Sequence, residues 1–152
     1  MNKIFKLFSF LLIGFIFSSK VVVANQLDNV AACSGVLIGN ASIDFRLGNQ
    51  KAFSDGVKLA ITAYMSEFLS KKYGKSNLLI ADKILSSNTD KIIYAANSNT
   101  FDENVYDEII KCYRSLGITI LKNADVIKNN SAKIRNMIMT KDQLIRRLLS
   151  AG

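Results

Sequence analysis

The chain has 152 residues, of which 49% are hydrophobic and 21% are charged. This length has room for one domain, and this hydrophobic content is sufficient for a core and excludes a chain that is disordered throughout. The absence of histidine removes the commonest general base, and the absence of proline favours a helical chain. The formal net charge is +8, which makes the distribution of the basic residues informative about partners.

Residues 1–24 have the order of a secretory signal peptide. Lys3 and Lys6 precede an apolar run from Leu7 to Phe17, and small residues follow at 22–24. The apolar run is shorter than a membrane-spanning helix, which favours cleavage. An uncleaved N-terminal anchor is the alternative, because further valines extend the run. We therefore expect an exported protein, periplasmic or extracellular, and the codon-driven abundance of Ile, Asn and Lys would fit a bacterial or phage origin.

Residues 25–40 read as the first helix of a mature domain spanning 25–152. Ala31, Gly35 and Gly39 form a stripe of small residues at four-residue spacing on this helix. A glycine inside a helix costs about 1 kcal/mol relative to alanine. We therefore expect the stripe to be a packing seam against a second backbone.

A connector over residues 42–49, with Asn49 as a helix N-cap, leads to the longest periodic segment, which runs to Tyr73 and stops at Gly74. Gly56 belongs to a second small stripe that would receive the first helix. The large side chains of this segment share one face, as in a core helix. They are Phe53, Val57, Ala60, Ile61, Tyr64 and Phe68.

Residues 76–97 are less regular, because turn-forming residues occupy positions 86–90. This pattern predicts two short helices or one broken helix, with a strand at 91–95 as an alternative.

The next predicted helix spans residues 100–117. Thr100 and Glu103 have capping-box spacing, and Gly117 would end the helix. Acidic residues precede basic residues along it, which suits the helix dipole. The face that includes Ile109 and Cys112 is apolar and should be buried.

An amphipathic segment spans residues 131–150. Lys141 falls inside its apolar arc, so we expect the helix to break and restart at Thr140, which has capping-box spacing with Gln143. Residues 118–152 contain 7 basic and 2 acidic residues, so the excess charge of the mature chain lies here. Four cations flank the apolar face: Lys133, Arg135, Arg146 and Arg147.

These cations have three interpretations: a solvated helix face, contact with an anionic membrane surface or acidic partner protein, and nucleic-acid binding. Export disfavours nucleic acid. The absence of an aromatic residue after Tyr113, which leaves no ring to stack on a base, also disfavours it.

Cys33 and Cys112 are the only cysteines, and in an exported chain they predict a structural disulfide. Two cysteines without histidine do not make an ordinary zinc site, and their spacing is not that of a redox motif. Val30-Ala31-Ala32-Cys33 also resembles the lipobox of bacterial lipoproteins, which is a second interpretation of Cys33.

The predicted fold is a small all-α, single-domain bundle of four to six helices, with the second helix at its centre and one disulfide. We find no catalytic, cofactor-binding or metal-binding constellation, so we expect an exported, non-enzymatic binding or accessory protein with an unidentified protein partner. The alternatives are a peripheral envelope protein that uses its basic C-terminal helix and a small carboxylate-based hydrolase. The layout resembles that of small periplasmic acid-stress chaperones, without a shared motif, and a chaperone-like role would fit it.

Overall fold

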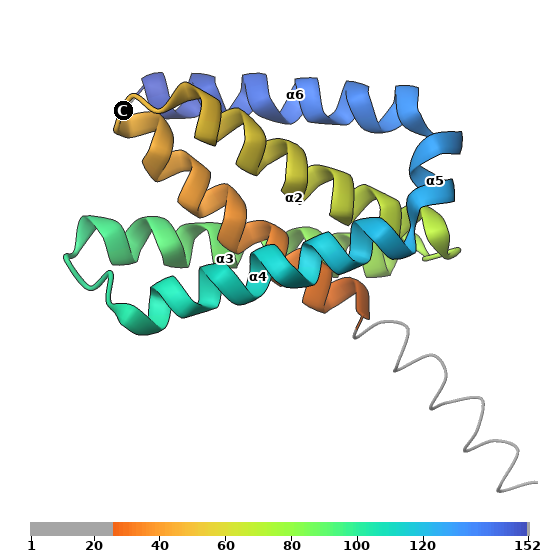
Figure 1. Ribbon diagram of the computed structural model, residues 1–152, viewed down its shortest axis with the longest axis horizontal. Helices are drawn as coiled ribbons and strands as arrows, with labels where there is room; N and C mark the ends of the chain where they lie inside the picture. The colour runs from red at the N-terminus through yellow and green to blue at the C-terminus, as the bar shows by residue number, and fades with distance from the viewer. Residues whose placement is uncertain (1–25, 152) are drawn as a thin grey trace, which may run out of the picture.

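The computed structural model describes residues 26–151, and its elements there are all helices (Figure 1). An N-terminal helix covers residues 26–46. It is followed by α2 (Gln50–Ser70), α3 (Lys75–Asn97), α4 (Glu103–Lys122), the short α5 (Ala124–Asn129) and α6 (Ser131–Ser150). The all-α prediction is therefore confirmed for this part of the chain. The predicted signal peptide lies outside the described residues.

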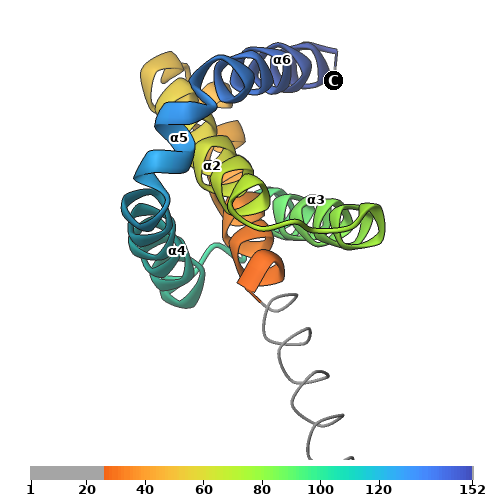
Figure 2. The same ribbon diagram turned by 90° about the vertical axis from the view of Figure 1, so that its right-hand side faces the viewer.

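The N-terminal helix and α2 form a central antiparallel pair, and the other long helices surround it. Figure 2 shows α3, α4 and α6 arranged around this pair. Helix α2 contacts α4, α5 and α6, which places the second helix at the centre, as predicted. Within residues 26–151 no helix is long and apolar enough to cross a membrane.

The core lies where the faces of the central pair meet those of α3, α4 and α6. The predicted face of α2 is buried, apart from Phe68, which is partly buried at its end. Other fully buried side chains include Leu37 of the N-terminal helix, Ile92 of α3 and Leu116 of α4. The helical periodicity of the sequence therefore identified the buried face of α2 correctly.

The small-residue stripe of the N-terminal helix is a packing seam, and its partner is α3. A Cβ atom on Gly35 would lie 2.2 Å from the carbonyl oxygen of Leu85, and one on Gly39 would lie 2.7 Å from Cβ of Ile92. The Thr89 hydroxyl lies 3.1 Å from the Gly35 carbonyl oxygen across the seam and 3.0 Å from the Leu85 carbonyl oxygen of its own helix, and it shares its one hydrogen between them. Hence these glycines let two backbones approach more closely than any side chain would allow.

Cys33 and Cys112 form a disulfide that joins the N-terminal helix to α4, with their Cα atoms 4.9 Å apart. This confirms the predicted bridge. It also excludes the lipoprotein interpretation, because an acylated Cys33 would have no sulfur available for Cys112.

Helix α3 is continuous, so the predicted break and the alternative strand are both wrong. Asn88 donates to the Ile84 carbonyl at 2.8 Å, and Thr89 donates to the Leu85 carbonyl at 3.0 Å. Side chains that favour turns elsewhere here bond back onto their own helix. Packing of Ile92 and Ala95 in the core supports the helix beyond this point.

Helix α4 begins and ends later than the sequence predicts. Its N-cap is Asp102, whose carboxylate accepts from the Val105 N–H at 3.1 Å, so the Thr100 capping box does not form. Gly117 does not end the helix, which continues to Lys122. The reason is that Leu116 and Thr119 are both buried, so the core holds the chain helical on both sides of the glycine.

Three other predicted boundaries are also wrong. The N-terminal helix continues to residue 46, and α2 ends at Ser70 rather than Tyr73, so that Gly74 precedes α3 as its N-cap. Helix α6 is continuous, because the Thr140 hydroxyl donates to the Asn136 carbonyl of its own helix at 2.9 Å instead of capping a new one. The predicted N-cap Asn49 is confirmed, since it accepts from the Ala52 N–H at 3.1 Å.

Candidate functional site

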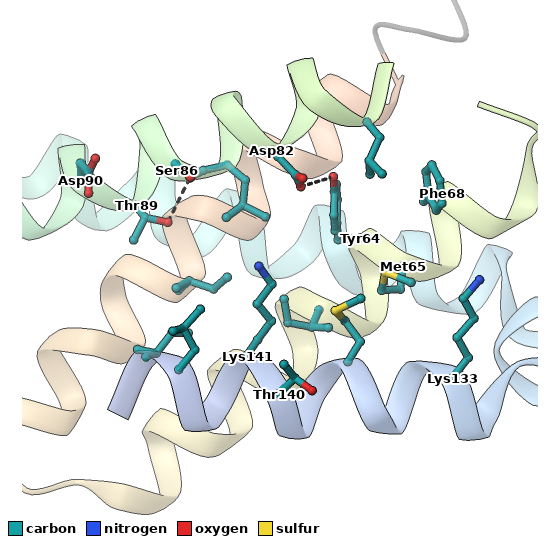
Figure 3. Close-up of a pocket in the computed structure, with 17 residues that line it drawn as sticks. Tyr64, Met65, Phe68, Asp82, Ser86, Thr89, Asp90, Lys133, Thr140 and Lys141 are labelled. Carbon is teal, nitrogen blue, oxygen red and sulfur yellow. Dashed lines mark hydrogen bonds between the residues drawn. The ribbon is translucent and has the colours of Figure 1, made fainter. Parts of the chain in front are cut away.

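A groove of about 670 Å³ lies between α3 and α6, and we call it the α3–α6 groove (Figure 3). The central pair supplies its floor, through Ile38 of the N-terminal helix and Ile61, Tyr64, Met65 and Phe68 of α2. The walls come from residues at helical spacing on α3 and α6. On α3 they are Leu78, Asp82, Leu85, Ser86, Thr89 and Asp90, and on α6 they are Lys133, Met137, Thr140, Lys141, Leu144 and Ile145.

Most of the side chains that line the groove are apolar. Its size falls in the range of about 300–1,000 Å³ that is usual for ligand sites. Leu144, an apolar residue of the α6 wall, is 47% exposed. The groove therefore offers apolar surface that the chain leaves accessible to a ligand.

One hydrogen bond crosses from the floor to the α3 wall. The Tyr64 hydroxyl donates to the Asp82 carboxylate at 2.8 Å, as Figure 3 shows. Burial, the hydrogen bond and the charge of Asp82 together raise the pKa of Tyr64, so the phenol stays neutral and remains a donor. This bond fixes α3 relative to α2 in the middle of the groove.

The four predicted basic residues do not form one surface. Lys133 lines the groove, whereas Arg135 and Arg147 are exposed outside it. Thirteen residues separate Lys133 from Arg146, which places them about 140° apart around α6 at 3.6 residues per turn. Each cation therefore has its own surroundings.

Arg146 links α6 to the N-terminal end of α2 through side-chain contacts. Its guanidinium bonds the Asp142 carboxylate at 2.5 Å and the Ser54 hydroxyl at 2.9 Å, and it also contacts Gln50. Its Cζ lies 4.4 Å from the centroid of the Phe53 ring, a cation–π geometry. Arg146 is therefore committed to contacts within the chain.

Glu67 lies in a buried polar cluster that the sequence did not reveal as such. Its carboxylate accepts from Tyr73 at 2.9 Å and Asn123 at 3.2 Å, and it pairs with Lys71 at 3.0 Å. Burial alone would raise the pKa of Glu67, but these hydrogen bonds and the charge of Lys71 outweigh burial and hold the pKa below its usual value. In the sequence, the position of Glu67 adjacent to the apolar face of α2 was the available indication that this carboxylate is buried. The cluster joins α2 to Asn123 at the α4–α5 junction.

The groove does not contain an evident catalytic pair. Asp82 and Asp90 are eight residues apart on α3, or about 12 Å at 1.5 Å per residue. This spacing exceeds the roughly 5–10 Å between the paired carboxylates of most glycosidases. Within residues 26–151, no group of three or more His, Cys, Asp or Glu residues is arranged to hold a metal ion.

No protein-family model matches the chain, and no curated protein or solved structure matches it either. The inference of function therefore depends on the chain's own geometry. That geometry is a small disulfide-bonded helical bundle with one side left open as an apolar groove.

Proposed function

We propose that the protein is an exported, non-enzymatic binding protein whose α3–α6 groove holds an amphipathic ligand. The observation that supports the proposal is the groove itself. Residues of α3 and α6 line its two sides and leave the apolar floor uncovered. A helical bundle normally buries such faces against another helix. Here a ligand would complete the burial.

Export is part of this proposal and has two supports. The N-terminal sequence has the order of a signal peptide. The Cys33–Cys112 bridge is typical of proteins that reside in oxidising compartments. A chaperone-like protein that holds apolar segments of exported chains would be one form of this function.

The peripheral-surface alternative has weaker support than the groove. Arg146 is engaged with α2, Arg135 lies about 160° around α6 from Lys133, and Arg147 lies about 21 Å along the helix from Lys133. Attraction to an anionic surface is strongest when cations lie together on one face. The arrangement therefore favours the groove as the binding site.

The proposal can be tested with a neutral apolar dye, N-phenyl-1-naphthylamine, and two tryptophan variants. Ser86 lines the groove and Ser87 does not, although both are exposed on α3, so Ser86→Trp would obstruct the groove and Ser87→Trp is the matched control. We expect dye fluorescence to rise with wild-type protein and Ser87→Trp but not with Ser86→Trp. Equal fluorescence with both variants, or none with wild type, would refute the groove as a binding site.

A further inference from the structure

The two walls of the α3–α6 groove carry opposite charges. Lys133 and Lys141 lie on the α6 wall, and Asp82 and Asp90 lie on the α3 wall. Figure 3 shows both lysine side chains rising from α6 into the groove. Within the described part of the chain, neither lysine forms an ion pair or a hydrogen bond. The groove therefore separates two unpaired cations from two anions across an apolar floor.

The spacing of these charges is the same on both walls. Eight residues separate the two lysines and eight separate the two aspartates, which corresponds to about 12 Å along each helix. The walls run in the same direction, because the starts of α3 and α6 both lie at the C-terminal end of α2 (Figure 1). A complementary ligand thus needs an apolar face with charges at intervals of about two helical turns along both edges.

An amphipathic α-helix has this form. It presents an apolar stripe about 100° wide with charged residues on its flanks, and it packs on other helices at 8–10 Å between axes. A single-chain lipid has one charged head group. It would match one lysine and offer no charge to the second lysine or to either aspartate. The charge pattern therefore favours the helix.

We infer that the α3–α6 groove binds an amphipathic helix of a partner protein, with an acidic flank along α6 and a basic flank along α3. This inference rests on the proposed binding function and adds the class of ligand. It also specifies direction. Turning a helix end for end in the groove exchanges its left and right flanks, so a helix with one acidic and one basic flank fits in only one direction.

The test uses two synthetic peptides of about four helical turns that have the same composition and apolar face. In one peptide the acidic and basic flanks are exchanged relative to the other. Each carries a nitroxide spin label at its N-terminus, and NMR of the isotopically labelled protein measures broadening of backbone amides. We expect one peptide to broaden amides at the Phe68 end of the groove and the other to broaden amides at the Ile145 end. Broadening at the same end by both peptides would overturn the inference.

Charge-reversal variants supply a second readout. Lys133→Glu/Lys141→Glu should weaken binding of both peptides about tenfold or more, because it places like charges along one flank. The matched control is Arg135→Glu/Arg147→Glu, which makes the same change in net charge at exposed positions of α6 outside the groove. Equal weakening by the two double variants would show a general charge effect and would contradict the inference.

Two further results separate this inference from the proposed function. If the neutral dye binds but neither peptide does, the groove binds ligands and the helix is the wrong ligand. If hexadecanoate displaces the dye and the peptides do not, the groove is a lipid site and the inference is likewise overturned. Absence of dye binding would instead refute the proposed function itself.

Discussion

The seam between the N-terminal helix and α3 allows a sharp test of the packing, through Gly35→Ala. The added Cβ would lie 2.2 Å from the Leu85 carbonyl oxygen, whereas real Cβ atoms essentially never approach another atom within 3.0 Å. The obstacle is backbone, so it cannot rotate away, and Thr89 holds α3 to this turn. Overpacking of this kind costs about 1–3 kcal/mol, and the better helix propensity of alanine offsets at most about 1 kcal/mol. We expect a net loss of about 1–2 kcal/mol in the free energy of unfolding.

Gly117→Ala is the matched control, because it makes the same substitution in a helix where nothing lies within 4 Å of the added Cβ. Here only propensity acts, so we expect a gain of about 0.5–1 kcal/mol. Urea unfolding followed by far-UV circular dichroism measures both variants. If Gly35→Ala proved as stable as wild type while Gly117→Ala was stabilised, the seam would not be as close as described.

Three other predictions concern further interactions that stabilise the fold: the disulfide, the Glu67 cluster and the contacts of Arg146. Cys112→Ser should lower the free energy of unfolding by about 2–5 kcal/mol, and mass spectrometry should find the wild-type chain about 2 Da lighter before reduction than after it. Two free thiols in freshly exported protein would contradict this. Because its native pKa is depressed below 4.5, Glu67 contributes stability that is complete above that pH and is lost as pH falls through the native value. Glu67→Gln should therefore cost about 1–3 kcal/mol at neutral pH and flatten the decline between about pH 5 and pH 3, and an unchanged decline would refute the role of this carboxylate. Arg146→Ala should cost about 1–2 kcal/mol, whereas Arg147→Ala, at an exposed position, should cost almost nothing, and equal effects in thermal unfolding would count against the contacts of Arg146.

The sequence was sufficient to predict the buried faces of α2 and α4, because the apolar pattern repeats along each helix, but it did not predict that Leu144 and Leu148 of α6 are 47% and 66% exposed. It was misleading about where helices end. The residues at 86–90, Gly117 and Thr140 all favour a break locally, yet the chain is helical at each of them. A local preference of this kind is worth about 1 kcal/mol or less per residue. Buried residues on both sides, such as Leu116 and Thr119 around Gly117, stabilise the continuous helix by more than that.

The groove could not be predicted from the sequence, since its walls lie about 50 residues apart along the chain and their separation depends on the packing of both on the central pair. One residue of the sequence nevertheless indicated the groove. Lys141 interrupts the apolar arc of α6, which we interpreted as a helix break. The structure shows instead that this part of the arc faces the groove, where a lysine can keep its charge accessible to water. The conflict between pattern and residue thus marked the wall of a groove and not the end of a helix.

Each wall of the groove is attached to the central pair by its own set of contacts. The glycine seam and the Tyr64–Asp82 bond attach α3 to the central pair, and Arg146 and the buried Ile134 attach α6 to it. Among residues 26–151, no hydrogen bond or ion pair joins α3 directly to α6. The width of the groove is therefore determined by two central helices that are packed tightly together, while its open side stays free of internal contacts. A helix bound in the groove would supply the contacts that link the two walls.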